Sequence, residues 1–554
     1  MRGKLRNWSK YVMYVLVIFH CAVGLSVWFA RLSTSEKQQR LVRNGVRVIS
    51  DHTEQMMIGL FAMLLGIALI VVLWNGIFWG MKHERTKCIL IVCTSVVIGI
   101  LVTPLNYTLE TDNAELYVAA TRGCVEYWHG FYQSVLYQAC MIVLYHPMTI
   151  TILQCAGFLS VITYLAMRIR TNFGRHWDKL IWLVLLFPST FEIMVNPYRN
   201  NINTIICVFF LGSVLLDCVE QRNRSFSYHL LLGAILGLMV AYRMENVSLG
   251  LVYLYVIIRN YSRQVKKIAC ALGLCVIVFV VANIPQKLGD MKYYGKDYMI
   301  VNQMNTLQYI MQQPGVNSTY EGAQEDILTI HEFANLQGIL GGGLDGYRAR
   351  RYAVIGDANQ SLKSDAEQNR FLRACYRLYW NNPSVYLKER YETFLESNAF
   401  GMRGKYADEE TSAFYNQVTT MFLHNYDVVE RDSKRIEGMR FRGFNLCAFY
   451  FFNACKGFSD ILYEQSIWPA MRVLNYGFFF ICFVVGVVRL DKNKILLCSF
   501  FLSCIMNMIS VFLFEPEGRM VYFTPVSYLI ALFNFVVILE IIKQKHNMKY
   551  IDEK

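Results

Sequence analysis

The sequence is poor in charged residues. Only 17% of its 554 residues are Asp, Glu, Lys or Arg, against roughly 25% in an average soluble domain. Apolar types make up 55% and aromatic types 14%. This balance excludes an ordinary soluble protein. It also excludes a disordered chain, because disordered chains have too little apolar surface to bury.

Several motifs that would assign an enzyme class are absent. The sequence has no GxxxxGK[ST], no GxGxxG between a strand and a helix, no HExxH and no DxD pair. A built-in ATPase, a dinucleotide-binding fold and a zincin are therefore excluded, and nucleotide-activated sugar donors are disfavoured. The 16 cysteines include no CxxC pair and lie mostly in apolar runs. They indicate small hydrophobic residues rather than zinc ligands or a disulfide framework.

Long apolar runs are abundant instead. A helix needs about 20 mostly apolar residues to cross a bilayer. The clear runs cover 11–30, 57–80, 88–105, 149–167, 178–195, 266–284, 468–488, 494–513 and 520–541, and three shorter ones cover 201–217, 229–241 and 247–258. The sequence predicts an all-α fold, a polytopic membrane helix bundle of about twelve spans with a mostly helical extracytoplasmic domain.

Lys and Arg indicate how these spans are oriented. The chain has 54 basic and 41 acidic residues, a formal charge of +13. Basic residues gather in segments that alternate correctly with twelve spans if both termini are cytoplasmic: 1–10, 81–87, 168–179, 218–228, 259–267, 489–494 and the C-terminal tail. The basic segment 31–56 departs from this pattern because it falls on the outer side. The excess is mainly an orientation signal, and it does not indicate nucleic-acid binding.

One long segment differs in composition from the rest. In 285–467, 42 of 183 residues are charged, against 53 of the other 371. We therefore divide the chain into a transmembrane bundle over 1–284 with a catalytic outer loop at 106–148, an extracytoplasmic domain over 285–467, and C-terminal transmembrane helices with a cytoplasmic tail over 468–554. Turn signals in the middle part separate helix-like stretches at 361–380 and 384–398.

Polar clusters gather on the predicted extracytoplasmic side. They lie at 105–129, 196–201, 242–246 and 514–519. A charge facing lipid costs roughly 2.5–3.5 kcal/mol on insertion scales, so such residues normally face the bundle interior or water. Four clusters at one depth predict one shared site.

The charges of these clusters suit a phosphate-leaving-group transferase. Asp112, Glu115 and Glu126 offer carboxylates for general-base catalysis or metal binding. Guanidinium groups that can hold a phosphate bidentately are Arg199, Arg243 and Arg519.

Each of these residues also has a structural interpretation. Carboxylates in outer loops are often simply solvated. Arg243 and Glu245 could form an ion pair that stabilises a turn, and Arg519 could be an anchor at the membrane surface. His129 follows an aromatic residue, which is typical of interfacial packing as well as of a ligand contact.

The arrangement resembles the GT-C superfamily of integral-membrane glycosyltransferases, which take sugar from a polyprenyl-phosphate carrier. The resemblance covers roughly 105–260 and 515–541. The residues that carry it are Thr111-Asp112-Asn113-Ala114-Glu115, Trp128-His129-Gly130-Phe131, His146-Pro147, Asn196-Pro197-Tyr198-Arg199-Asn200, Tyr242-Arg243-Met244-Glu245 and Gly518-Arg519-Met520-Val521-Tyr522 with Pro525. Two additional spans before the acidic loop and the 183-residue outer domain depart from the family's pattern.

The resemblance implies roles for individual residues. Asp112 would be the general base or a metal-linked carboxylate, with Glu115 as its competitor. Arg243 and Arg519 would hold the departing lipid phosphate, and Arg199 would line the same cavity. The implied partners are a polyprenyl-phosphate-linked sugar donor, an extracytoplasmic glycan, lipid or protein acceptor, and membrane lipid. No cofactor is certain, a divalent metal stays open, and a bacterial plasma membrane follows from the family's habits.

Two other functions are compatible with the sequence. A lipid-linked polysaccharide polymerase or ligase also has about twelve spans and a large outer loop, and it depends on outer-loop arginines more than on an acid. A polysaccharide or lipid transporter would show symmetry between halves and charges in the middle of its spans.

Overall fold

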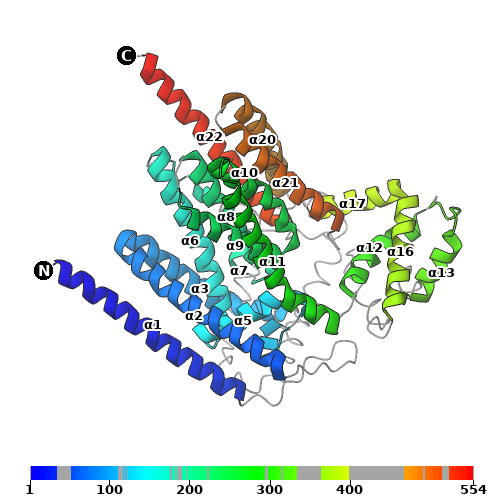
Figure 1. The fold of residues 1–554 in the computed structure, drawn as a ribbon, viewed down its shortest axis with the longest axis horizontal. Helices are drawn as coiled ribbons and strands as arrows, with labels where there is room; N and C mark the ends of the chain where they lie inside the picture. Colours follow the sequence, from blue (N-terminus) through cyan, green and yellow to red (C-terminus); the bar gives the residue numbers. More distant parts are fainter. Residues whose placement is uncertain are drawn as a thin grey trace. The chain divides into compact units, whose positions relative to one another are not determined.

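The structure is a computed structural model that consists of helices and their connections (Figure 1). It describes residues 2–33, 52–109, 127–174, 197–220, 224–293, 297–313, 316–333, 364–397, 467–490, 493–514 and 523–552, with short stretches within 116–125 and 177–195. These residues contain no strand. The all-α prediction is confirmed for them.

Eight of the described helices are long and apolar enough to cross a membrane. Their apolar segments are Tyr11–Ala30, Gln55–His83, Met148–Phe173, Arg199–Val219, Val265–Gly289, Ala470–Arg489, Lys494–Phe514 and Thr524–Lys543. Each of them overlaps a predicted span, which supports a multi-pass membrane protein.

The predicted count of about twelve spans is not confirmed. The run at 88–105 corresponds to helix α3 (Arg85–Leu109), which is not among the eight. Two of the short runs correspond to α9 (Phe226–Tyr242) and α10 (Gly250–Tyr261), of 17 and 12 residues. In the described part of 178–195, the α-helix is the six-residue α7 (Thr190–Val195). The remaining four predicted spans therefore stay a prediction.

The described residues divide into two compact units. Unit 1 holds those up to Leu216 and unit 2 those from Asp217 onward. The boundary falls inside helix α8 (Arg199–Val219). The domain boundary that the sequence suggests at 284 falls within unit 2, inside helix α11 (Val265–Tyr293).

In unit 1, long helices surround one short helix. The remaining elements are α1 (Arg2–Ser33), α2 (His52–His83), η1 (Tyr127–His129), α5 (Phe131–Val143) and α6 (Met148–Phe173). Helix α5 packs along α2 and α1, and α6 packs along α3 (Figure 1). At the far end of α6, Arg170 lies 3.8 Å from Glu84 in the turn between α2 and α3. Unit 1 therefore encloses α5 within long apolar helices.

Close approach to α5 explains two glycines in the spans. A Cβ on Gly24 of α1 would collide with the backbone oxygen of Ile142. A Cβ on Gly66 of α2 would lie 2.9 Å from the Ile142 side chain. Both glycines lie well inside their apolar segments, so the end of α5 lies at the depth of the spans.

A backbone break at this depth is closed by side chains from neighbouring spans. Helix α5 ends at Val143 and α6 begins at Met148. Trp74 of α2 donates to Nδ1 of His20 at 3.1 Å, so Nε2 carries the proton that His20 of α1 donates to the Val143 oxygen at 2.6 Å. In addition, Thr149 donates to the Leu144 oxygen at 2.8 Å. Non-helical backbone is tolerated at membrane depth only when its polar groups have such partners.

The predicted outer loop at 106–148 is therefore helical over much of its described length. Helix α5 is buried along nearly all its residues, polar ones included. Its 13 residues are too few for a full span, because a helix rises 1.5 Å per residue. A search of the sequence for apolar runs of span length therefore does not detect a helix as short as α5.

Unit 2 contains a group of apolar helices and a more charged helical part. The apolar group has four helices long enough to span a membrane, α11, α20 (Ile467–Arg489), α21 (Lys494–Phe514) and α22 (Thr524–Asp552), and the shorter elements α9, η3 (Met244–Leu249) and α10. Helix α9 packs along α11, α10 along α21, and α20 along α22. The last pair is joined by buried amides: Asn475 donates to the Ser527 oxygen at 3.0 Å, and Asn534 donates to the Asn475 oxygen at 3.1 Å. Such bonds between spans stabilise a bundle modestly.

The more charged part of unit 2, which we call the four-helix domain, has its own core. It comprises α12 (Asp297–Gln312), α13 (Ala323–Phe333), α16 (Asp365–Asn381) and α17 (Pro383–Ser397). Its buried residues include Ile300, Leu307, Ile330, Phe371 and Leu378. The helices predicted at 361–380 and 384–398 are α16 and α17.

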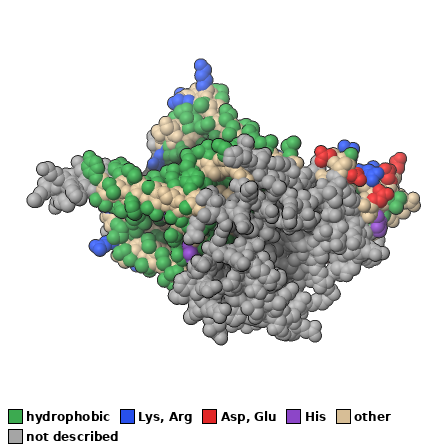
Figure 2. All heavy atoms as spheres, turned by 90° about the horizontal axis from the view of Figure 1, so that it is seen from below, with side chains coloured by type: hydrophobic (Ala, Val, Ile, Leu, Met, Phe, Trp, Pro, Cys, Tyr) green, Lys and Arg blue, Asp and Glu red, His purple; other side chains and the backbone are tan. Residues whose placement is uncertain are grey.

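Local sequence fixes where these two helices begin. Ser364 and Glu367 form a capping box at the start of α16, which satisfies backbone N–H groups that have no partner inside the helix. Helix α17 begins with Pro383, whose missing N–H is not needed at a first helical position. Figure 2 shows acidic side chains over the part of the molecule that holds α13 and α16.

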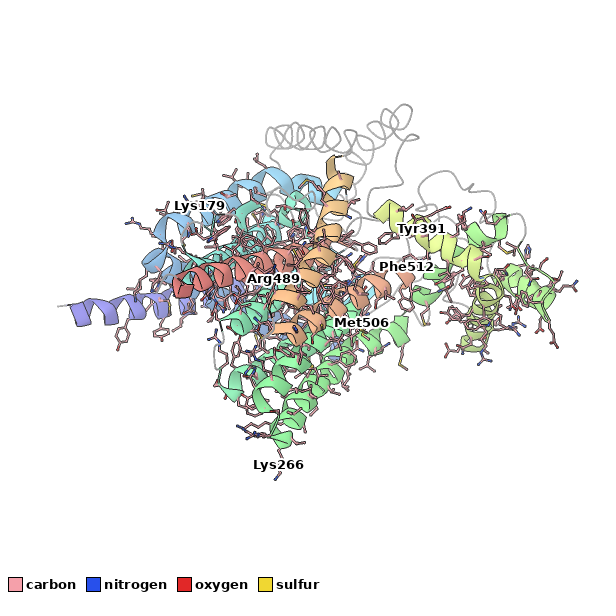
Figure 3. The ribbon with its side chains drawn as sticks, turned by 90° about the horizontal axis from the view of Figure 1, so that it is seen from above. Lys179, Lys266, Tyr391, Arg489, Met506 and Phe512 are labelled. Carbon is pink, nitrogen blue, oxygen red and sulfur yellow. The ribbon has the colours of Figure 1, made fainter. Side chains whose placement is uncertain are left out.

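Helix α17 joins this domain to the spans of unit 2. The Phe394 ring packs against Phe512 and Phe523, with centroids 6.1 and 5.1 Å away. Phe512 lies near the C-terminal end of α21, and Phe523 directly precedes the first residue of α22. Figure 3 labels Tyr391 on α17 and Phe512 on α21. The four-helix domain is therefore anchored at one end of this helix pair.

Candidate functional site

The first predicted site residue that the structure places is Arg199, at the start of α8. The backbone N–H groups of Asn201 and Ile202 donate to the Tyr198 oxygen at 3.0 and 3.2 Å, which closes the first turn. The preceding Pro197 leaves its carbonyl oxygen pointing at α5. Gln133 donates to it at 2.8 Å and the Tyr137 hydroxyl at 3.4 Å. Two buried side chains of α5 thus fix the beginning of α8.

The same region brings His129 and Arg199 together. Arg199 Nη1 donates to the His129 carbonyl oxygen at 3.3 Å. Gly130 follows with φ of 101°, and a Cβ there would lie 2.9 Å from the same nitrogen. Only glycine adopts this backbone conformation readily and also leaves room for the guanidinium group. His129 contributes its backbone oxygen to this contact, and its side chain is buried.

Asn200 is a residue of this region that the sequence did not single out. It is 1% exposed, and neither its amide nitrogen nor its amide oxygen makes a hydrogen bond. Buried polar side chains are normally hydrogen-bonded, so an exception needs an explanation. The signal in the sequence was the run from Arg199 to Asn201 at the head of an apolar segment, where the arginine alone was given a role.

The second predicted site lies in unit 2, where α9 gives way to η3. Arg243 ends α9, and its Nε and Nη2 donate to the two carboxylate oxygens of Glu245 at 3.2 and 2.6 Å. The arginine side chain is 10% exposed and the glutamate side chain 29%. This bidentate geometry is the strong form of an ion pair. The structural interpretation of the pair, a stabilised turn, therefore describes its geometry correctly.

Helix α21 anchors this turn. Asn507 donates to the Glu245 carbonyl oxygen at 3.0 Å, and Ser503 donates to the Ser248 carbonyl oxygen. Asn246 bonds back to the Met239 oxygen at 2.8 Å. The carbonyl oxygens of Met239, Glu245 and Ser248, in and next to η3, thus have partners, as a dry interior requires.

The other predicted site residues lie outside the described residues: Asp112, Glu115 and Arg519. Arg199 belongs to unit 1, and Arg243 and Glu245 belong to unit 2. The convergence of these residues on one site stays a prediction.

Metal-binding and disulfide chemistry have no support in the described part of the chain. It contains no group of three or more His, Cys, Asp or Glu side chains that could hold a metal ion. Its cysteines are free, and many are buried in apolar surroundings. Their interpretation as small hydrophobic residues agrees with this.

Comparisons with known proteins assign no family to the chain. No family model, no curated protein and no solved structure matches it.

Proposed function

We propose that the protein is a membrane glycosyltransferase that moves a sugar from a polyprenyl-phosphate carrier to an extracytoplasmic glycan, lipid or protein. The observation that carries this proposal is the buried polar region at the start of α8. It combines a guanidinium group held by the His129 backbone with the Gln133 and Asn200 amides. Guanidinium groups bind phosphate, and amides bind hydroxyl groups, so the region has the functional groups that a sugar phosphate requires.

The depth of this region suits a lipid-linked substrate. The Phe131 ring, next to Gly130, packs edge-on against Phe61 of α2, with centroids 5.7 Å apart. Phe61 lies six residues inside the apolar segment that begins at Gln55. Arg199 is thus close to one end of a span, where a phosphate at a lipid headgroup would lie. In the proposed orientation, with cytoplasmic termini, this is the outer end.

The reaction would be a displacement at the anomeric carbon. The acceptor oxygen forms a bond to this carbon while the bond to the phosphate oxygen breaks, and the acceptor proton passes to Asp112, with Glu115 as the other candidate. The lipid phosphate departs with its charge, which Arg199 would stabilise. A guanidinium group has five N–H donors, so the pair with Glu245 is compatible with phosphate binding by Arg243.

The test uses purified protein in nanodiscs with a panel of radiolabelled polyprenyl-phosphate sugars. Release of the lipid phosphate is followed for wild type, Asp112→Asn and Glu115→Gln. Release that Asp112→Asn abolishes would support the proposal and identify the donor. Release that depends on Glu115 alone would move the general base to that residue. The donors are supplied together with glycan, lipid and peptide acceptors, because the sugar must pass to an acceptor oxygen, and a folded wild-type protein that then releases phosphate from no donor would contradict the proposal.

A transporter is the second candidate, and one observation favours it. The backbone break between α5 and α6 lies at the depth of the spans and is served by the polar side chain of His20. Interrupted helices of this kind form substrate sites in transporters. Movement of a lipid-linked sugar across proteoliposomes without release of phosphate would establish that function. Release that depends on arginines and not on Asp112 would instead indicate a polymerase or ligase.

A further inference from the structure

We infer that Asn200 binds a ring hydroxyl group of the sugar carried on the lipid phosphate, next to the phosphate that Arg199 holds. This inference rests on the proposed function and adds a sugar-recognising residue to it. It starts from the Asn200 amide, which is 1% exposed and makes no hydrogen bond within the protein.

Burial without a hydrogen bond is unfavourable for an amide. In water both its nitrogen and its oxygen would be bonded, and folding removes those bonds without replacing them. Asn246 shows the usual solution in this molecule. It is equally buried, yet its nitrogen donates to the Met239 oxygen at 2.8 Å. Asn200 thus differs from a structural amide of the same type and burial.

The side chain of Asn200 is not needed to position the start of α8, because other groups do so. Its carbonyl oxygen already accepts from the Thr204 hydroxyl at 2.8 Å. The turn before it is held by Gln133, and Arg199 is held by the His129 oxygen. Substituting Asn200 would therefore remove none of the bonds that position the start of α8.

The chemistry of an amide selects the ligand. An amide offers N–H donors and a carbonyl acceptor, whereas a phosphate oxygen only accepts. A hydroxyl group both donates and accepts, so one or two ring hydroxyls satisfy both ends of the Asn200 side chain. Consecutive Cα atoms are about 3.8 Å apart. Arg199 and Asn200 both lie in the first turn of α8, so a ligand at this end of the helix can contact both side chains although they leave the helix in different directions, and a sugar bonded directly to a phosphate is long enough to do so.

The decisive experiment separates the sugar from the phosphate. Wild type and Asn200→Leu are assembled in nanodiscs, and binding is measured for polyprenyl-phosphate glucose, polyprenyl-phosphate mannose and unsubstituted polyprenyl phosphate. We expect Asn200→Leu to raise the Kd of the preferred sugar lipid about tenfold, and that of the unsubstituted phosphate less than about twofold. Asn200→Ser, which keeps one hydroxyl, should give an intermediate Kd.

Two control variants exclude a merely structural role. Asn203→Leu makes the same change one turn further along α8 and should leave both Kd values unchanged. Thermal unfolding supplies a second readout. Asn200→Leu should unfold at or above the wild-type temperature, because it removes an unbonded buried amide. Asn246→Leu should unfold at a lower temperature, because it removes a bonded one.

The possible results distinguish this inference from the proposed function. If Asn200→Leu binds the sugar lipid as wild type does, weakens both ligands equally, or lowers the unfolding temperature, the inference is wrong and the proposed function stands. A wild-type protein that binds sugar lipids no tighter than the unsubstituted phosphate also overturns the inference alone. If wild type binds none of the three lipids, the proposed function fails and the inference with it.

Discussion

Two regions of the molecule bury polar side chains in opposite ways. In the four-helix domain, the Asp326 carboxylate is fully buried, pairs with Arg377 and accepts from the Tyr320 hydroxyl at 3.0 Å. At the start of α8, the Asn200 amide is equally buried and has no hydrogen bond within the protein. The first arrangement links α13 to α16 and so serves the fold. The second adds nothing to the fold, and this contrast directs the search for a ligand to α8.

The segments that carry Arg199 and Arg243 hold their arginine side chains in different ways. Arg243 is paired bidentately with Glu245, and the turn is tied to α21 by Asn507. Arg199 instead donates to a carbonyl oxygen beside a glycine that leaves room for it. We therefore expect substitutions at Arg243 to affect stability first and substitutions at Arg199 to affect activity first.

The largest expected effect is on stability, at Arg377. Arg377→Gln leaves the fully buried Asp326 carboxylate without its cation, and because the Arg377 side chain is itself 53% exposed, water screens part of the interaction and the expected cost is about 2 kcal/mol. Arg370→Gln is the matched control, because it lies on the same helix and pairs with Glu332 at 3.0 Å, but with both side chains exposed. Its cost should stay below about 1 kcal/mol. Hydrogen exchange of α13 and α16 in the full chain measures both. Equal effects would contradict the distinction.

The next effect is on activity, at Arg199. We expect Arg199→Gln to reduce release of lipid phosphate by about 100-fold, the loss typical of removing one donor that stabilises a departing charge. Arg170→Gln is the control, since it removes an arginine of the same unit at the far end of α6. It should leave release unchanged. An Arg199→Gln protein that unfolds early and recovers full activity at low temperature would reveal a structural role.

A smaller effect is expected from the Arg243–Glu245 pair. Arg243→Gln and Glu245→Gln should each lower the unfolding free energy, and the double variant should lose about 1 kcal/mol less than their sum. Thermal unfolding in detergent measures the cycle, and phosphate release measures function in parallel. A loss of release in Arg243→Gln, with the unfolding temperature unchanged, would show that Arg243 binds the phosphate as the sequence suggests.

The smallest effect is a loss of stability of the four-helix domain at high pH. Burial, followed by the hydrogen bond to Asp326 and its charge, raises the pKa of Tyr320 above its ordinary value of 10.0. The folded state then binds the proton more tightly than the unfolded state does. Stability is fully present below about pH 10 and declines as the pH rises above it. Tyr320→Phe should flatten this decline in thermal unfolding between about pH 8 and pH 11. An unchanged decline would assign it to other groups.

Much of the architecture could be predicted from local sequence. Seven of the eight helices long enough to span a membrane were predicted by clear apolar runs and the eighth by the shorter run at 201–217, because crossing a bilayer imposes length and composition on a continuous segment. The helices α16 and α17 were predicted within a few residues, because the turn signals that separate them lie in the sequence itself. Helix α5 was not predicted from local sequence, since its burial depends on Gly24 and Gly66 of other helices.

The candidate site was predicted less completely. The sequence proposed Arg199, Arg243, Glu245 and His129 as site residues from polar clusters at the ends of apolar runs, and their convergence on one site stays a prediction. It could not find Asn200, because a buried amide with a hydrogen bond and one without look alike in a sequence. It placed His146-Pro147 among the residues that carry the resemblance, without revealing that the break before α6 lies at membrane depth.

By itself the sequence determined that this protein has helices apolar enough to span a membrane and a more charged segment at 285–467, because composition and run length are properties of contiguous residues. Only the tertiary structure decided which polar groups are satisfied and which are not. The partner of Asp326 is 51 residues away, and that of Val143 is 123 residues away. Hydrogen bonds over such separations depend on how helices pack, and the packing defines the contrast between Asp326 and Asn200.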